Sequence, residues 1–138
     1  MRYILLLAIF SIFLSAKYIE VGNRVLDDKT NLEWQNDSQV NSTKLNWSES
    51  IKFCENLELD GYKDWRVPNI VELVSLIDDT KTQPLISNIF KNSAGDFWTS
   101  TTYANDSLQA WIVIFNYGTQ YYKDKSEQYY VRCVRGGI

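Results

Sequence analysis

The fold is decided by the stretch Gly61-Tyr62-Lys63-Asp64-Trp65-Arg66-Val67-Pro68-Asn69-Ile70-Val71-Glu72-Leu73. Pro68 disfavours the helical conformation at Val67, so the chain is expected to be extended there. Asn69 can cap a helix, and Glu72, three residues later, can complete a capping box. Apolar residues follow at the spacing of a half-buried helix, at Ile70, Leu73, Val74 and Ile77. The stretch therefore predicts a turn and then a helix from Ile70 to about Asp78.

A second helix is expected upstream of this stretch. Asn46 can cap it, with Glu49 at the reciprocal position, and Gly61 lies beyond its end. The expected apolar face of this helix contains Trp47, Ile51, Cys54 and Leu57. One of the two cysteines of the chain should therefore face the core.

Strand signals lie on both sides of the expected helices. Val25-Leu26 and Leu32-Glu33-Trp34 read as a hairpin, with Asn31 able to take the left-handed conformation of its turn. Three later segments are strand-like: 97–102, 110–115 and 129–135. Alternation in the last of them places Tyr129, Val131 and Cys133 on one face. Two helices followed by a mainly antiparallel sheet predict an α+β fold.

Residues 1–16 have the pattern of a signal peptide. Arg2 supplies a short basic region, Ile4 to Leu14 an apolar core, and Ser15-Ala16 a small-residue end. The apolar run is too short to span a bilayer, which takes about 20 residues. We expect cleavage after Ala16, an exported protein, periplasmic, secreted or at the cell surface, and one domain over residues 17–138. The alternative is an uncleaved segment that associates with the membrane.

Charge and cysteine content narrow the class of protein further. The formal net charge is −3, which argues against nucleic acid as a partner held by bulk electrostatics. Two cysteines in an exported chain favour one disulfide, Cys54–Cys133, joining the first helix to the last strand. The alternative is two buried thiols, or a reactive one. The oligomeric state is not encoded in any pattern we can identify.

The ordered set of motifs resembles the Lcl C-terminal domain family, a bacterial family found in collagen-like adhesins and in stand-alone exported proteins. The segments that carry the resemblance are Val25-Leu26-Asp27-Asp28-Lys29-Thr30-Asn31-Leu32-Glu33-Trp34-Gln35, Trp47-Ser48-Glu49-Ser50-Ile51 with Cys54, Gly61 to Asn69, Glu72-Leu73, Phe97-Trp98-Thr99-Ser100-Thr101-Thr102, Ala110-Trp111 and Val131-Arg132-Cys133-Val134-Arg135. The resemblance implies a C-type-lectin-like scaffold whose loops bind ligands. It does not imply a particular ligand, because one fold hosts many functions.

Enzyme chemistry is not expected, and neither is a cofactor. The chain has no histidine, so it lacks the commonest general base and the commonest zinc ligand. Oxygen-rich loops can hold Ca²⁺, and acidic residues occur in expected loops at Asp78, Asp79, Asp96, Asp106, Asp124 and Glu127. No EF-hand spacing exists among them, so we predict no metal site and interpret these residues as solvated carboxylates.

Aromatic residues are the remaining candidates for a binding site. The five tryptophans fall inside the scaffold motifs and are expected in the core. Tyr103, Tyr117, Tyr121 and Tyr122 lie in or beside late loops, among amides that suit recognition of a polar ligand. The predicted site is Tyr103, Asn105, Asp106, Gln109, Asn116, Tyr117, Gln120, Tyr122 and Lys123. The alternative is that these tyrosines are ordinary residues of a strand edge.

The residues of the opening stretch are expected to be structural. Asp64 and Arg66 can satisfy loop amides and bridge to the final strand, with Arg132 or Arg135 as a partner. The sequence thus predicts an exported, non-enzymatic module that binds a glycan or a protein through loops after the second helix. The alternative is an envelope protein that acts in assembly through protein–protein contacts.

Overall fold

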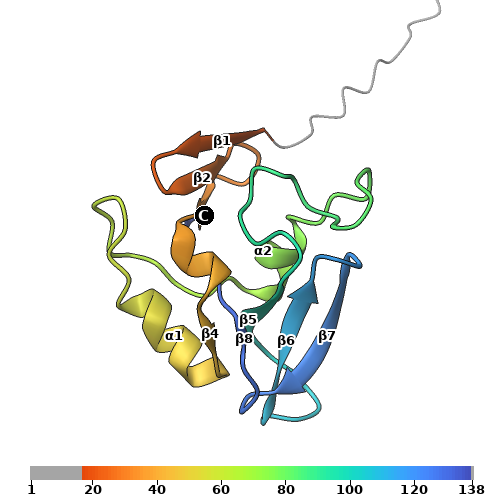
Figure 1. The fold of residues 1–138 in the computed structure, drawn as a ribbon. Helices are drawn as coiled ribbons and strands as arrows, with labels where there is room; N and C mark the ends of the chain where they lie inside the picture. The colour runs from red at the N-terminus through yellow and green to blue at the C-terminus, as the bar shows by residue number, and fades with distance from the viewer. Residues whose placement is uncertain (1–16, 138) are drawn as a thin grey trace, which may run out of the picture.

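Residues 17–137 are described by a computed structural model, in which two helices pack on two β-sheets (Figure 1). The predicted signal peptide, residues 1–16, lies outside the described residues. The α+β class predicted from the sequence is confirmed. Within residues 17–137, no helix is long and apolar enough to cross a membrane.

The first sheet joins both ends of the described chain. It contains β1 (Tyr18–Val21), β2 (Arg24–Asp27), β3 (Leu32–Gln35) and β9 (Val134–Gly136), in the order β1-β2-β3-β9 with antiparallel pairing throughout. The predicted hairpin is β2–β3, and Asn31 in its turn has a φ of 59°, as expected for the left-handed conformation. A short 3₁₀ helix, η1 (Ser38–Asn41), follows β3.

The second sheet is mostly antiparallel. It contains β4 (Lys44–Leu45), β5 (Asp96–Thr102), β6 (Gln109–Ile114), β7 (Thr119–Asp124) and β8 (Tyr129–Tyr130), in the order β4-β8-β5-β6-β7. The pair β5–β8 is parallel, and the other pairs are antiparallel. β6 and β7 form a hairpin, and β7 is an edge strand of this sheet (Figure 1).

Both helices begin where the caps predict. The side chain of Asn46 accepts a hydrogen bond from the Glu49 backbone N–H at the start of α1 (Trp47–Glu55). Asn69 and Glu72 form the full capping box of α2 (Ile70–Val74). α2 is shorter than the predicted helix to Asp78, because the chain tightens after Val74 into i→i+3 bonds and the Asp78 N–H then bonds to the Leu85 carbonyl at 2.8 Å.

The main core lies between α2 and the two sheets. Leu73 of α2 belongs to the same buried cluster as Trp34 of β3, Phe97 of β5 and Val113 of β6. A second cluster surrounds the Cys54–Cys133 disulfide and includes Trp65, so this residue of the opening stretch is buried as predicted. The disulfide prediction is confirmed, and the cysteines are not free thiols.

The segment 129–135 does not form the single alternating strand that the sequence predicts. It crosses from the second sheet to the first, so β8 ends at Tyr130 and β9 begins at Val134. Every residue from Val131 to Val134 is buried, because both sides of the crossing segment meet protein. Cys133 therefore lies just before the last strand and not within it.

Arg132 is fully buried in this crossing. Its Nη1 donates to the Gln35 carbonyl at 2.8 Å and to Asn36 Oδ1 at 3.1 Å, and its Nη2 donates to the Lys91 carbonyl. Because these acceptors come from segments far apart in sequence, the guanidinium ties them together in the interior.

Candidate functional site

The five tryptophans do not share one environment. Trp34, Trp65 and Trp98 are buried, as predicted, but Trp47 and Trp111 are only partly buried. The prediction that all five lie in the core is therefore wrong for these two. Trp111 belongs to β6, and near it one face of the second sheet is not fully covered.

Trp111 lies opposite Tyr122 in the β6–β7 hairpin. Leu108 and Lys125 are the next pair in the register of β6 and β7, and the Lys125 N–H donates to the Leu108 carbonyl at 2.9 Å. Hydrogen-bonded and non-hydrogen-bonded pairs alternate along an antiparallel ladder, so this bond fixes the type of every other pair. Trp111 and Tyr122 are accordingly a non-hydrogen-bonded pair, in which opposite side chains lie closest. The two rings meet edge to face at 5.7 Å.

Three tyrosines stack beside Trp111. The Tyr122 ring lies nearly parallel to Tyr103, with centroids 4.0 Å apart, and nearly parallel to Tyr121 at 4.6 Å. Tyr103 also meets Trp111 edge to face at 5.4 Å. We call these four residues the tyrosine stack. Since Tyr121 and Tyr122 are neighbours in an edge strand, Tyr121 must bend around the open edge to reach Tyr122.

The tyrosine hydroxyls of the stack form a polar cluster. Interactions with the neighbouring hydroxyls, that of Tyr121 first and that of Tyr103 second, raise the pKa of Tyr122 above its usual value. Tyr122 is thus a neutral phenol at neutral pH, able to donate and to accept a hydrogen bond. Asn105 Nδ2 donates to the Tyr103 hydroxyl at 3.3 Å, which adds an amide to the same cluster.

The structure brings most of the predicted site residues to one end of the β6–β7 hairpin. Tyr103, Asn105, Asp106 and Gln109 lie at the β5–β6 connection, next to Tyr122 and Lys123 of β7. Two of them have structural bonds: Asp106 Oδ1 accepts from the Leu108 N–H at 2.9 Å, and Gln109 Nε2 donates to Asp124 Oδ1 at 3.2 Å.

The other predicted residues do not join this group. Asn116 and Tyr117 lie in the turn at the opposite end of the hairpin, five residues before Tyr122 along the chain. Five residues of extended chain span about 16 Å, so Tyr117 cannot belong to the tyrosine stack. Gln120 lies between the two ends, on β7.

Two members of the stack were not in the predicted site. Trp111 was assigned to the core, and Tyr121 was named among the late tyrosines but left out of the final set. Gln120, Tyr122 and Lys123 were expected in or beside late loops, and they lie within the edge strand β7, as the strand-edge alternative has it for Tyr122. The β-prone run Thr119-Gln120-Tyr121-Tyr122 after the turn at Gly118 was the signal for this strand.

Three rings that are at least partly exposed, one of them Tyr121 of the tyrosine stack, have cations over their faces. Lys125 Nζ lies 4.0 Å from the centre of the Trp47 ring, and Lys44 Nζ lies 4.7 Å from that of Tyr130. Lys123 Nζ lies 5.6 Å from the centre of the Tyr121 ring. These faces already have cation–π partners, so a ligand would have to displace a lysine to stack on them.

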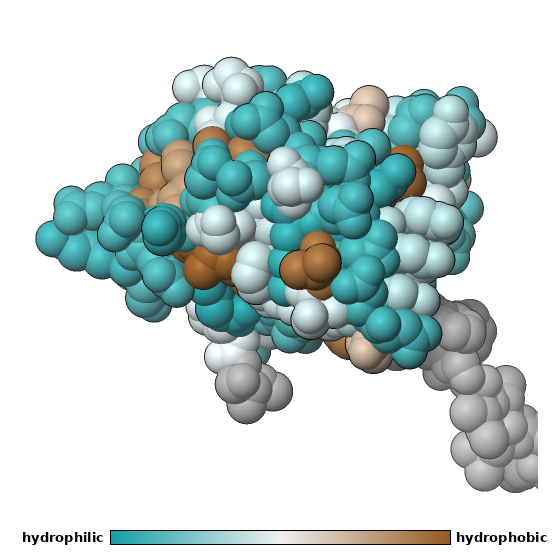
Figure 2. Space-filling view, turned by 90° about the horizontal axis from the view of Figure 1, so that it is seen from below, coloured by the Kyte–Doolittle hydropathy of each residue, from teal (hydrophilic) through white to brown (hydrophobic). Residues whose placement is uncertain are grey.

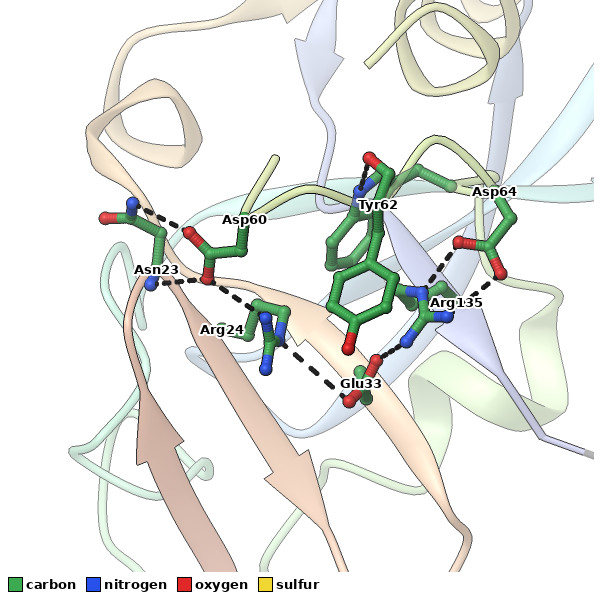
Figure 3. A network of polar contacts seen from close by, with 8 residues as sticks. Asn23, Arg24, Glu33, Asp60, Tyr62, Asp64 and Arg135 are labelled. Atoms are coloured by element: carbon green, nitrogen blue, oxygen red, sulfur yellow. Dashed lines mark hydrogen bonds and ion pairs between the residues drawn. The ribbon is translucent and has the colours of Figure 1, made fainter. Parts of the chain in front are cut away.

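The opening stretch forms a closed network and not a free site (Figure 3). Arg135 makes a two-point contact with Asp64 (2.7 and 3.1 Å) and pairs with Glu33. The prediction that Asp64 has an arginine of the last segment as partner is confirmed. The Tyr62 ring lies beside two guanidiniums, 3.6 Å from that of Arg135 and 4.8 Å from that of Arg24.

Asp60 and Arg66 complete the attachment of this loop. Asp60 accepts from the Asn23 N–H at 2.9 Å and pairs with Arg24 at 3.4 Å. Arg66 pairs with Glu72 through two bonds of 2.7 Å and donates to the Gly136 carbonyl at 3.1 Å. Each charged group has a partner inside the protein, so the network holds loop 58–66 against the first sheet.

A polar cavity of about 630 Å³ lies between the β2–β3 turn and the loop after α2. Burial and the charges of Asp27 and Asp78 raise the pKa of Tyr18 in its wall to about 12. The two carboxylates are already bonded, Asp27 to the Lys29 N–H and Asp78 to the Thr80 N–H. No cluster of three or more metal-ligating side chains occurs in residues 17–137.

The surface seen from below is mostly hydrophilic (Figure 2). Hydrophobic residues occur on this face in a few separate spots. A face of this kind suits contact with water and polar ligands more than with lipid.

These features define a small, disulfide-linked α+β domain with a partly exposed aromatic cluster on its second sheet. The chain belongs to the Lcl C-terminal domain family, whose sequence model matches residues 23–135. The family resemblance identified from the motifs is thereby confirmed. No curated protein matches the chain at a significant level.

Proposed function

We propose that this protein is an exported, non-enzymatic binding module that recognises a glycan through the tyrosine stack. The observation that carries the proposal is the stacked group Tyr103–Tyr122–Tyr121 next to the partly exposed Trp111. Flat rings offer apolar surface to the carbon faces of sugars, and phenol and amide groups at their edges can bond to sugar hydroxyls.

Export and the absence of catalysis rest on separate features. The Cys54–Cys133 disulfide is compatible with an oxidising compartment outside the cytoplasm. With both cysteines in that disulfide and no histidine in the sequence, the Ser–His and Cys–His pairs of hydrolases cannot be assembled. We propose a C-type-lectin-like scaffold for the same chain, supported by its two helices, its paired terminal strands and the disulfide.

The binding site can be tested with one substitution at each end of the hairpin. Tyr122→Ala removes the middle ring of the stack, and Tyr117→Ala removes an equally large ring that is 65% exposed at the far end. We expect the exported protein to bind a subset of a glycan array, Tyr122→Ala to lose that binding, and Tyr117→Ala to keep it. The free energy of unfolding of both variants, measured in urea, serves as the control for folding.

A second pair of measurements separates the sources of affinity. Tyr103→Phe keeps the ring and removes the hydroxyl, so a loss of binding in this variant assigns a direct bond to the phenol. An arm with a calcium chelator should give unchanged binding. Capture of matrix proteins instead of glycans, or equal loss in Tyr117→Ala and Tyr122→Ala, would overturn the glycan assignment.

The second candidate function is assembly with other proteins in the envelope. A specific feature favours it, the open edge of β1 at the margin of the first sheet (Figure 1).

A further inference from the structure

Three of the four sheet edges are short or partly capped. β4 has only two residues, and the last backbone N–H of β7, that of Asp124, bonds to Glu127 Oε2 at 3.1 Å. β9 has three residues, and Val134 exchanges two backbone bonds with Arg66, at 2.8 and 2.9 Å. Short strands, charged side chains and covering segments are the usual means of preventing edge-to-edge pairing.

The fourth edge, β1, has four residues and one charged side chain, Glu20, but within the described residues no hydrogen bond occupies its outward backbone groups. Lys17 and Asp28 are the next pair in the register of β1 and β2, and the Asp28 N–H donates to the Lys17 carbonyl at 3.2 Å. This bond shows which residues of β1 form hydrogen-bonded pairs with β2, because the two pair types alternate. Ile19 and Val21 therefore direct their backbone groups toward β2, whereas Tyr18 and Glu20 direct theirs away from the sheet. β1 lies at the outer margin of the molecule (Figure 1).

The side chains of β1 make this edge apolar on one face. Ile19 and Val21 are each 40% exposed, two residues apart on the same side of the strand. Ile19 lies opposite Leu26 of β2, and both line a shallow cavity of about 430 Å³. An open edge with exposed β-branched residues is a template for another strand.

We propose that β1 pairs with β1 of a second copy of this chain, antiparallel and across a two-fold axis. In two symmetric registers, the outward backbone groups of Tyr18 and Glu20 can bond to the second copy. One places Glu20 opposite Glu20 of the second copy, which sets two carboxylates against each other and is unfavourable. The other places Ile19 opposite Ile19 and Tyr18 opposite Glu20, and it is the register we assign.

This register also explains the apolar side chains. Ile19 is already opposite Leu26, so the dimer aligns Leu26, Ile19, Ile19 of the second copy and its Leu26 in one cross-strand row. The first sheet becomes continuous through both copies. Four residues a side give a contact smaller than the roughly 1,200–2,000 Å² of stable complexes, so the dimer is weak and depends on concentration.

Cross-linking tests the register directly. In the assigned register the two Ile19 Cα atoms form a non-hydrogen-bonded pair about 4.5 Å apart, within disulfide range. The two Val21 Cα atoms are displaced by four residues, about 13 Å along the strand, beyond that range. Because both native cysteines are paired, Ile19→Cys and Val21→Cys each add one free thiol to the chain.

The full chain, expressed for export, is oxidised at high concentration and analysed on non-reducing gels. We expect Ile19→Cys to form covalent dimers at least about tenfold faster than Val21→Cys, since only its thiols meet within bonding distance. Equal rates for the two variants, or faster cross-linking of Glu20→Cys, would overturn the register.

Sedimentation velocity of the unmodified chain tests the association itself. We expect a dimer fraction that rises with concentration, that Ile19→Lys abolishes, and that Thr119→Lys on the β7 edge leaves unchanged. A monomer at every concentration, or a dimer that is lost equally in both variants, would overturn the proposal.

Discussion

Replacing Glu72 by Ala should destabilise the protein more than any other single change on the surface of α2. Glu72 Oε1 accepts the Asn69 backbone N–H at 2.9 Å and so completes the capping box. Both of its carboxylate oxygens also bond to Arg66 at 2.7 Å, and Arg66 reaches the Gly136 carbonyl of β9. One side chain thus links the helix start, the preceding turn and the last strand.

The expected loss follows from these bonds. The reciprocal bond of a capping box is worth roughly 0.5–1 kcal/mol. Bonds between charged groups contribute about 1.5–3 kcal/mol when buried, but the Arg66 side chain is 43% exposed, so solvent screens this pair. We expect Glu72→Ala to lower the free energy of unfolding by about 2 kcal/mol. Glu72→Gln keeps an oxygen for the Asn69 N–H and should lose about half as much.

The loss should also depend on pH. Burial alone would raise the pKa of Glu72, but the bonds from Arg66 and from the Asn69 N–H lower it below its usual value of 4.5. A carboxylate with a lowered folded pKa contributes its stability above the unfolded value, and loses it as pH falls through the folded pKa. The difference in free energy of unfolding between the native chain and Glu72→Gln should therefore be largest at neutral pH and decrease as the pH falls through the folded pKa of Glu72.

Urea unfolding, followed by tryptophan fluorescence at pH 7 and at several acidic pH values, measures both effects. Asp64→Asn is a useful comparison, because Asp64 also pairs with an arginine but takes no part in a helix cap. A loss below about 0.5 kcal/mol in Glu72→Ala, within the range of ordinary surface substitutions, would refute the reasoning. A difference that stays constant into acid would refute the pH argument.

Two further predictions concern the interior. Replacing both Cys54 and Cys133 by Ala should lower the free energy of unfolding by about 4–5 kcal/mol in the chain-entropy model, because the disulfide closes a separation of 79 residues; urea unfolding that shows a loss below about 1 kcal/mol would contradict it. Arg132→Ala should cost about 3 kcal/mol or more, since it empties a buried site and removes the donor from the Gln35 and Lys91 carbonyls. Arg132→Lys should cost less in the same assay, and equal losses would contradict the role of the guanidinium.

Local signals in the sequence predicted much of the fold. Asn46 and Asn69 cap the two helices because their side chains bond to backbone groups only three residues away. Asn31 takes a positive φ for an equally local reason. The disulfide followed from the number of cysteines and the expected compartment, with the family motifs in agreement.

Long-range packing explains what was missed in the fold. The alternation of residues 129–135 predicts a strand, but Val131 to Val134 cross between two sheets and are buried on all sides. Arg132 would not be placed in the interior from its residue type, because burial requires carbonyl acceptors supplied by residues 35–36 and 91. α2 ends early because Asp78 bonds to Leu85, a contact that no helix periodicity encodes.

The candidate site was predicted in part for similar reasons. Residue type singled out Tyr103 and Tyr122, but nothing in the sequence showed that their rings stack at 4.0 Å. That contact depends on the pairing of β6 with β7. The same pairing places Trp111 beside Tyr122 and puts Tyr117 at the other end of the hairpin. Which aromatic residues share a face became clear only from the register of this hairpin.

The most direct test of the binding proposal is a quantitative comparison of Tyr122→Ala and Tyr117→Ala on the same glycan array, with equal unfolding free energies as a precondition. The tyrosine stack predicts at least a tenfold loss of affinity in Tyr122→Ala, equivalent to about 1.4 kcal/mol, and native binding in Tyr117→Ala. Native binding in Tyr122→Ala, in a variant that is folded, would contradict the assignment of the stack as the binding site.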